Sequence, residues 1–377
     1  MPKFIALATA VSVALPALSA QGRTLLGTNP ALVPQNTIVT QGGPGGPSAP
    51  GNPDDARYNA TFGRFAGVDG VVSLLIRTPV GNFGCTGTLL NNRRQILTAA
   101  HCLTNEVGNP ALFATSVDVR FQGPSNTFER TITVPASGMR IHPGYTGLVV
   151  ADNDLAVLDL PTEAPTFARG VGIFNGPASA VLGQQITFVG YGSTGTGTTG
   201  DGQGGFAFRR RFGFNRLEST CSAIGATPAS NDCGFDATPN GNRGIFLSDF
   251  DNGSPLTDTM CVLYQPTTNP LVCNRGVTGD ILDEVGVGRG DSGGPALFNG
   301  LIAGVASWGT GGSLNPGAFG AWGALYGHVN VTLASNQAWL NLVAPGAVVP
   351  EPSTYALMAT GLAGLAAIAR RRRTPKA

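Results

Sequence analysis

Residues 288–309 read GRGDSGGPALFNGLIAGVASWG and contain the clearest indication of the fold. Two apolar runs, 295–298 and 301–307, are joined by Asn299-Gly300, a pair that tolerates the positive φ angles of a tight two-residue turn. The stretch therefore predicts a β-hairpin. It follows a glycine-rich loop in which Ser292 stands between Asp291 and two glycines.

Other short apolar or alternating runs predict further strands, because each is bounded by Gly, Pro, Asn or Thr. These runs are 71–77, 95–99, 117–121, 155–160 and 185–190. Before the C-terminal tail only residues 335–343 have a helical pattern, with Ser335 as the expected N-cap. The body of the chain is therefore expected to be all-β and to end in one helix.

Composition supports this expectation. The chain has 55 glycines and 27 prolines among 377 residues, with only 12% charged residues, as in proteins built from strands and turns. This composition excludes a coiled coil, a helical bundle and a charge-driven disordered chain. The net charge is +1, but both lysines and four arginines lie near the two ends, so the region between residues 21 and 350 is mildly acidic. We therefore expect no nucleic-acid partner.

The glycines around Ser292 leave its hydroxyl accessible and remove Cβ atoms that would crowd the backbone. The N–H groups of Gly290 and Ser292 can then converge on one point, as the donors of an oxyanion hole do. Arg289-Gly-Asp291 is also a familiar cell-adhesion tripeptide. We interpret it as a coincidence, because adhesion does not require the Ser-Gly-Gly-Pro that follows.

His101 is one of three histidines and lies in LTAAHC, residues 97–102, directly after a predicted strand. Histidine titrates near neutral pH and is the usual general base for a hydroxyl nucleophile. Cys85 is a candidate disulfide partner for Cys102, and this bond would fix the backbone beside the imidazole.

Asp154 lies in NDLAVL, residues 153–158, where a predicted buried strand begins. A carboxylate in this position can accept a hydrogen bond from Nδ1 of a histidine and stabilise the imidazolium. Asp152 and Asp159 are the local alternatives. Asp154 is favoured because it immediately precedes the apolar run.

The chain order His, Asp, Ser separates this set from other serine hydrolases. The nucleophile elbow of an α/β-hydrolase requires an acid and then a histidine after the serine. Here the only acid after Ser292 is Glu351. A subtilisin-type order could use Asp69, but the chain lacks the helical stretches that an α/β sheet needs.

The stretches 97–102, 153–158 and 290–295 (GDSGGP), in this order, resemble the chymotrypsin-like (trypsin-type) serine proteases. Further matches lie between residues 71 and 343: IHPGY at 141–145, GYG at 190–192 and SWG at 307–309. The resemblance implies two six-stranded antiparallel β-barrels and a C-terminal helix, with the active site between the barrels.

Carried over residue by residue, the resemblance implies a catalytic set. His101 would be the general base, Asp154 its orienting acid and Ser292 the nucleophile. The amides of Gly290 and Ser292 would form the oxyanion hole. The implied function is an exported serine endopeptidase that acts on proteins or peptides through an acyl-enzyme, with no cofactor or metal. The alternative, a catalytically silent surface-binding domain on the same fold, is disfavoured because none of these residues is missing.

The resemblance also implies where substrate would bind. The segment that pairs with substrate backbone would comprise Ser307, Trp308 and Gly309. The floor of the specificity pocket would be Gly286, so we expect an open, uncharged pocket that prefers apolar residues. Asp283 and Glu284 lie close enough in sequence to change this preference.

Activation is a further expectation from the resemblance. In the family, proteolysis frees an N-terminal ammonium that pairs with the acid before the nucleophile, which is Asp291 in this chain. Cleavage after Arg64 or after Arg57 could supply such a terminus. Neither position is followed by the usual Ile-Val-Gly-Gly.

Between Gly192 and Ser292 the chain is longer than in typical members, which predicts an insertion at about 193–285. Four cysteines lie in it: Cys221, Cys233, Cys261 and Cys273. Three pairings are possible, and the equal spacings favour Cys221 with Cys233 and Cys261 with Cys273. The run 249–253 (DFDNG) is too short for an EF-hand loop. A calcium site there is the alternative to the favoured interpretation, a strand that ends in a turn. The arginine run 209–211 is expected at a solvated strand edge.

Residues 1–20 place one lysine before an apolar stretch that ends in Ser19-Ala20, which is typical of a secretory signal peptide. Export makes the six cysteines natural disulfide partners. Residues 21–64, including QGGPGGPSAPGNPDD at 41–55, are predicted to be a linker or pro-segment. The protease-like domain is predicted at 65–346.

The tail at 349–377 combines VPEPS, a mostly apolar run at 354–369 and four arginines. This order resembles the PEP-CTERM sorting signal of bacterial surface proteins, which an exosortase system is thought to process. The apolar run would form a helix of about 24 Å, shorter than a hydrocarbon core of about 30 Å. We therefore expect transient membrane contact and delivery to the cell envelope, surface or extracellular matrix. An ordinary C-terminal membrane anchor is the alternative reading of the tail.

Overall fold

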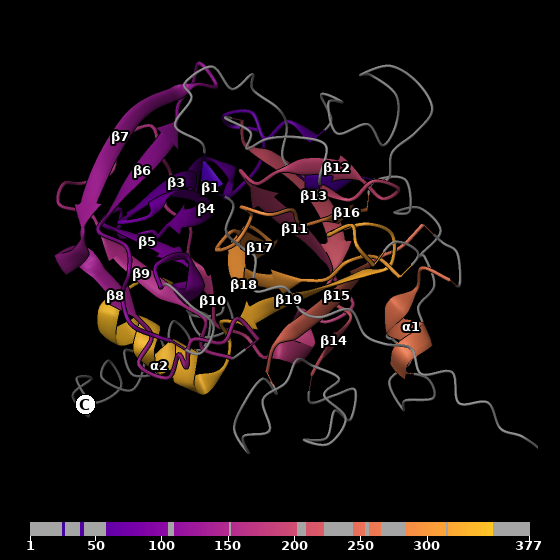
Figure 1. Cartoon of the computed structure of the whole chain (residues 1–377). Coiled ribbons are helices and arrows are strands. Elements are labelled where there is room, and N and C mark those ends of the chain that lie inside the picture. Colours follow the sequence, from indigo (N-terminus) through magenta and orange to yellow (C-terminus); the bar gives the residue numbers. More distant parts are fainter. Residues whose placement is uncertain are drawn as a thin grey trace, which may run out of the picture.

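The computed structural model describes residues 25–26, 38–40, 58–104, 109–150, 152–201, 209–221, 244–252, 256–264, 284–313 and 316–349. Strands are the main regular secondary structure among these residues. Figure 1 shows two curled sheets side by side, with helix α2 (Ala334–Val343) below the first sheet and the short helix α1 (Thr259–Tyr264) beyond the second. The all-β prediction with a C-terminal helix is confirmed.

The first sheet has the order β7-β6-β3-β4-β5-β9-β8, and β1 (Leu25–Leu26) pairs with β4. Its strands are β3 (Val71–Thr78), β4 (Gly81–Leu89), β5 (Gln95–Thr98), β6 (Ser116–Gln122), β7 (Phe128–Pro135), β8 (Met139–Ile141) and β9 (Ala156–Asp159). Only the turn η4 (Ala136–Gly138) separates β7 from β8. The sheet therefore begins and ends on one bent strand, and the path has six strands when this strand is counted once.

The second sheet repeats this pattern in the order β13-β11-β17-β18-β19-β15-β14. Its strands are β11 (Gln185–Gly190), β13 (Arg211–Arg216), β14 (Ser219–Thr220), β15 (Phe246–Phe250), β17 (Pro295–Phe298), β18 (Leu301–Gly309) and β19 (Ala324–Asn330). Two residues separate β13 from β14, so this sheet also returns to the strand on which it began. All these neighbours pair antiparallel.

Shorter strands complete the two sheets. β10 (Ile173–Phe174) pairs parallel with β18 and with β20 (Val348–Val349). A small separate sheet has the order β12-β2-β16, formed by β12 (Thr194–Thr196), β2 (Ile38–Thr40) and β16 (Val285–Gly286).

The predicted hairpin is confirmed by its turn. Asn299 and Gly300 have φ angles of 51° and 78°, as a two-residue primed turn requires, and they join β17 to β18. The strands predicted at 71–77, 95–99, 117–121, 155–160 and 185–190 are also present, within a residue or so of β3, β5, β6, β9 and β11.

Two clusters of buried apolar side chains form the core. The larger cluster joins side chains of the first sheet, such as Leu74 and Val157, to Trp339 and Leu340 of α2. The smaller cluster belongs mainly to the second sheet and contains the rings of Phe188, Phe246, Phe250 and Tyr326. Each fully buried side chain of this size contributes about 1.5–3 kcal/mol to stability.

The predicted N-cap of α2 was wrong. The helix begins at Ala334, so Ser335 lies inside it, and the N-cap is Leu333, which makes no side-chain capping bond. Tertiary contacts fix this helix end, because the side-chain amide of Asn336 donates to the carbonyls of Asn330 and Asp152. Helix α1 was not predicted, since its six residues are too few to show a helical period.

The interpretation of arginines 209–211 as a solvated edge was wrong for two of the three. Arg210 and Arg211 are each only 1% exposed. The Arg210 guanidinium donates to the carbonyls of Ala60 and Val71 at 3.1 and 3.2 Å and lies 3.4 Å from Oδ1 of Asp69. This residue therefore ties the segment before β3 to the start of β13.

The packed domain includes residues beyond both ends of the predicted range 65–346. Tyr58 and Ala60 are buried, and the Ala60 N–H donates to the Arg210 carbonyl at 3.1 Å. At the other end, β20 pairs with β10. The predicted signal peptide at 1–20 and the apolar run at 354–369 lie outside the described residues.

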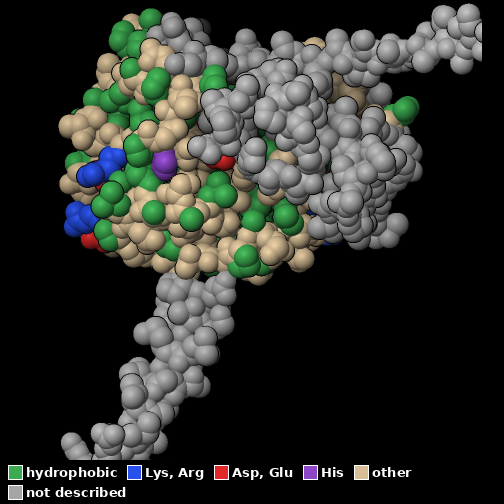
Figure 2. Space-filling model, turned by 90° about the horizontal axis from the view of Figure 1, so that it is seen from below, with side chains coloured by type: hydrophobic (Ala, Val, Ile, Leu, Met, Phe, Trp, Pro, Cys, Tyr) green, Lys and Arg blue, Asp and Glu red, His purple; other side chains and the backbone are tan. Residues whose placement is uncertain are grey.

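No helix among the described residues is long and apolar enough to cross a membrane. Figure 2 shows one face of the molecule. The basic side chains on this face gather at one edge, and most of the other described surface is hydrophobic or neutral.

Candidate active site

The pairing of β5 with β9 brings His101 next to Asp154. Thr98, the last residue of β5, is opposite Ala156, the first residue of β9. His101 lies in the turn η3 (Ala100–Cys102) that follows β5, and Asp154 directly precedes β9. The predicted pair is therefore juxtaposed by strand register, because the end of one antiparallel strand lies beside the start of its partner.

Asp154 holds His101 at two points. Its Oδ1 accepts the backbone N–H of His101 at 2.8 Å, and its Oδ2 lies 2.7 Å from Nδ1 of the ring. Both residues are buried. A donor at Nδ1 leaves Nε2 as the basic nitrogen of the neutral imidazole.

Ser307 links this pair to the second sheet. Its hydroxyl is in hydrogen-bonding contact with the Asp154 carboxylate and with the Val149 carbonyl, and its single proton can go to either. The register between β18 and β19 shifts between Ala306 and Trp308, which places Ser307 in a bulge. Bulges re-aim side chains, and this one directs a hydroxyl of β18 toward an acid of the first sheet.

Ser292 lies where the two sheets meet. Its carbonyl oxygen accepts the N–H of Thr86 in β4 at 2.9 Å and lies 3.7 Å from Sγ of Cys102. The next residue, Gly293, donates to the Ala306 carbonyl at 2.8 Å. The serine is thus fixed beside the residue that follows His101 and beside the strand that carries Ser307.

A disulfide fastens the histidine turn to β4. Cys85 and Cys102 are bonded, with Cα atoms 6.4 Å apart, as the sequence predicted. Cys221 and Cys261 are also disulfide-bonded. Cys233 and Cys273 lie outside the described residues, so the preferred pairing in this region stays a prediction.

The loop that carries Ser292 contains two glycines with positive φ angles. Gly290 and Gly293 have φ angles of 97° and 82°, which residues with a Cβ rarely adopt. A Cβ on Gly293 would lie 2.1 Å from Oγ1 of Thr98. The Gly290 carbonyl accepts the Thr86 hydroxyl at 3.0 Å, and its N–H has no acceptor within the described part of the chain.

Asp291 is buried beside this loop. Its carboxylate accepts the N–H groups of Gly192 and Gly288, each at 2.8 Å. Burial, with a smaller contribution from the nearby Asp201, raises the pKa of Asp291 to about 7 against the lowering effect of those two bonds.

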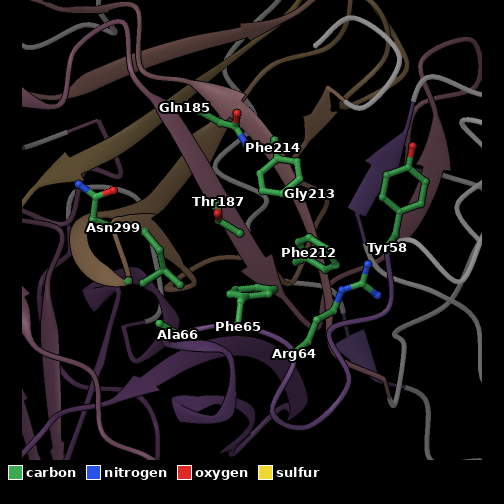
Figure 3. A pocket seen from close by; sticks show the side chains of 12 residues that line it. Tyr58, Arg64, Phe65, Ala66, Gln185, Thr187, Phe212, Gly213, Phe214 and Asn299 are labelled. Atoms are coloured by element: carbon green, nitrogen blue, oxygen red, sulfur yellow. The ribbon is translucent and has the colours of Figure 1, made fainter. Parts of the chain in front are cut away.

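Of the two predicted cleavage positions, Arg64 is among the described residues and Arg57 lies outside them. Arg64 donates to the Asn59 carbonyl at 3.0 Å, and its guanidinium lies 4.6 Å from the centre of the Phe212 ring. Phe65 packs on the same ring, at one side of a pocket of about 610 Å³ (Figure 3). Cleavage at either arginine stays a prediction.

A second, much smaller pocket of about 20 Å³ adjoins Ser292. The residues that line it are Val149, Val287, Gly288, Arg289, Ser292, Ala306, Ser307, Trp308, Gly309 and Phe319. Three of the four predicted substrate-binding residues are therefore placed together beside the serine.

Gly286, the fourth, does not line this pocket. A Cβ on Gly286 would lie 2.0 Å from the Tyr326 hydroxyl, so the tyrosine leaves no room for a side chain at this position. The pocket that adjoins Ser292 is small, and the role of Gly286 as the floor of a specificity pocket stays a prediction. No local sequence pattern indicated Phe319 or Tyr326 at this position.

A buried group of carboxylates lies elsewhere on the second sheet. The carboxylate oxygens of Asp249, Asp251 and Glu284 are within 4.8 Å of one another, and this is the kind of donor that hard cations prefer. Burial raises the pKa of Asp249 to about 8 and that of Glu284 and Glu218 well above the usual range. Burial therefore favours the neutral acids. The interpretation of 249–253 as the end of a strand is confirmed by β15.

Family comparisons match two separate parts of the chain. The model of the trypsin family matches residues 66–203, a range that includes His101 and Asp154 and ends before Ser292. The model of the PEP-CTERM protein-sorting motif matches residues 348–373.

Individual relatives are distant. Trypsin delta and trypsin gamma of Drosophila erecta are each 24% identical over 231 residues, which is 61% of this chain and 70% of theirs. A solved structure of HL collagenase is 18% identical, with a TM-score of 0.46, over 76% of this chain and 96% of that chain.

Proposed function

Because the chain carries a trypsin-family domain and a PEP-CTERM protein-sorting motif, we propose that it is an exported serine endopeptidase with His101, Asp154 and Ser292 as its catalytic triad. One observation carries the proposal. Asp154 is buried and receives the N–H of His101 on one oxygen and the ring Nδ1 on the other. This arrangement fixes both the position and the tautomer of the imidazole.

The first step forms an acyl-enzyme. Oγ of Ser292 attacks the carbonyl carbon of the peptide bond while His101 Nε2 takes the hydroxyl proton. The electrons of the C=O π bond move to oxygen. The imidazolium is stabilised by Asp154, whose remaining freedom is limited by its contact with Ser307. When the tetrahedral intermediate collapses, the C–N bond breaks and the departing amine takes the proton from Nε2.

The second step releases the product. Water enters as nucleophile, gives a proton to Nε2 and attacks the ester carbonyl, and collapse returns that proton to Oγ of Ser292. In both steps the N–H groups of Gly290 and Ser292 donate to the developing oxyanion. One such donor is worth about 3 kcal/mol of transition-state stabilisation.

Sequence signals at the two ends of the chain account for the proposed export and sorting of the protein. The signal-peptide pattern of residues 1–20 directs export, and the matched motif at 348–373 directs sorting by an exosortase-type system. The Cys85–Cys102 disulfide suits an oxidising location. The proposed place of action is the bacterial cell envelope or the space outside it, on protein or peptide substrates.

Labelling of the secreted protein with a fluorophosphonate tests the proposal. We expect one adduct, located on Ser292 by mass spectrometry of peptides, together with hydrolysis of an unstructured protein substrate. Ser292→Ala should lose both, whereas Ser125→Ala, which changes an exposed serine in the turn between β6 and β7, should keep both. Absence of an adduct in folded, processed wild-type protein would overturn the proposal in favour of a silent binding domain.

A further inference from the structure

Phe319 lines the small pocket beside Ser292, and Tyr326 lies close to Gly309, another of its lining residues. A Cβ on Gly309, at the end of β18, would lie 2.8 Å from Cζ of Phe319 and 2.9 Å from Cδ1 of Tyr326. These rings stand where a large substrate side chain would have to pass Gly309. The remaining volume of about 20 Å³ holds roughly one water molecule.

Phe319 is held in this place from two directions. Its carbonyl accepts the backbone N–H of Asp201 at 2.8 Å, and its ring lies 4.9 Å from the guanidinium of Arg289. A cation above an aromatic face is attracted to the ring. The ring is thus fixed by its backbone on one side and by a charge on the other.

Arg289 is in turn fixed by the same aspartate. Its guanidinium lies 2.7 Å from Oδ1 of Asp201, and its backbone N–H donates to Oδ2 at 2.8 Å. Oδ2 also accepts the hydroxyl of Ser193 at 3.0 Å. Asp201 is buried, so this ion pair is shielded from water on one side. Arg289 also lines the pocket, and 28% of its side chain is exposed, so Asp201 offsets its charge at the edge of the site.

We infer that Phe319, held by Asp201 and Arg289, restricts cleavage to peptide bonds that follow Gly, Ala or Ser. This inference rests on the proposed function, because it concerns the substrate of the same serine. A hydrogen, methyl or hydroxymethyl side chain fits the remaining volume. A branched, aromatic or long basic side chain requires Phe319 to leave its position, which breaks its contact with Arg289.

The experiment compares cleavage of one peptide series by the secreted, processed protein. The peptides differ only at the residue whose carbonyl is attacked, which is Gly, Ala, Ser, Leu, Phe or Arg. The concentration of active enzyme is first measured with the fluorophosphonate. We expect kcat/KM for Ala to exceed that for Leu, Phe and Arg by at least about tenfold, since one methylene alone can discriminate by that factor.

Phe319→Ala should raise kcat/KM for Leu and Phe by at least about tenfold while the value for Ala changes little. Phe319→Leu is a milder variant for use if the alanine variant folds poorly. It should raise kcat/KM for Leu and Phe relative to Ala by a smaller factor. Phe167→Ala is the matched control. The ring of Phe167 packs beside that of Phe62, with ring centres 6.4 Å apart, and Phe167 does not line the pocket.

The outcomes separate the inference from the function on which it rests. A protein that is not labelled overturns both. A labelled protein that cleaves after Leu, Phe or Arg as efficiently as after Ala overturns the inference alone. An unchanged Ala-to-Phe ratio in both Phe319 variants also overturns it, because another residue must then limit the pocket.

Discussion

Asp154 binds His101 through both of its carboxylate oxygens, one to the backbone N–H at 2.8 Å and one to Nδ1 at 2.7 Å. The two contacts differ in what they require. The backbone contact needs only an acceptor, which an amide oxygen also provides. The ring contact needs an acceptor on Oδ2, which an amide nitrogen cannot provide.

Asp154→Asn should therefore leave the fold intact and lower kcat by about 10⁴-fold, because the imidazole is held in the wrong tautomer. Steady-state kinetics on a peptide substrate and circular dichroism of the folded state measure the two effects. Asp159→Asn is the control, since Asp159 pairs with the half-exposed Arg140 outside the site. Equal activity of the Asp154 variant and wild type would contradict the assigned role.

Replacing both Cys85 and Cys102 by alanine should lower the free energy of unfolding by about 3 kcal/mol, because the bond closes a loop of 17 residues in the unfolded chain. Urea unfolding measures the change. Activity should fall as well, since the bond fixes the turn that carries His101. Wild-type stability in the variant would show that the remaining contacts of η3 suffice.

The buried Arg210 should be far more important for stability than its neighbour Arg209. Arg210→Ala leaves Asp69 and two carbonyls without their cation and should cost about 3–5 kcal/mol. Arg209→Ala changes an exposed side chain, whose interactions with charged groups are screened by water, and should alter stability by less than about 1 kcal/mol. Similar losses in the two variants, measured by denaturant unfolding, would refute this difference.

Asp291 should make stability depend on pH. Its pKa is about 7 in the folded protein against 3.8 for an ordinary Asp, so the folded state binds more protons between these values. Its contribution is therefore full below about pH 4 and is lost as the pH rises toward 7. Asp249, with a pKa of about 8, acts in the same direction.

Urea unfolding of wild type and Asp291→Asn between pH 4 and 8 checks this sign. The free energy of unfolding should fall less steeply with pH in the variant, because the amide does not titrate. A steeper fall in the variant would mean that the folded state lowers the pKa of Asp291.

The sequence indicated those parts of the structure whose signals are local. The Asn299-Gly300 turn, the strand runs and the loop around Ser292 each depend on a few consecutive residues. The proximity of His101 and Asp154 could be expected from the motifs, and strand register explains it.

The features that were missed depend on partners distant in sequence. Arg210 looked like a surface charge because its acceptors, at residues 60, 69 and 71, lie about 140 positions away. No local sequence pattern indicates the position of Phe319, because that position depends on contacts with Asp201 and Arg289. Ser335 had the chemistry of an N-cap, but the N-cap is Leu333, two residues earlier, and the side chain of Asn336 bonds the preceding loop at Asn330.

Strand β18 has a consequence for motion within the site. Ala306 accepts the N–H of the residue after Ser292, and its neighbour Ser307 contacts Asp154. Adjacent Cα atoms are about 3.8 Å apart whatever the protein does. Adjacent residues of β18 therefore contact the nucleophile loop and the acid at the same time. A displacement of this strand should disturb both contacts together.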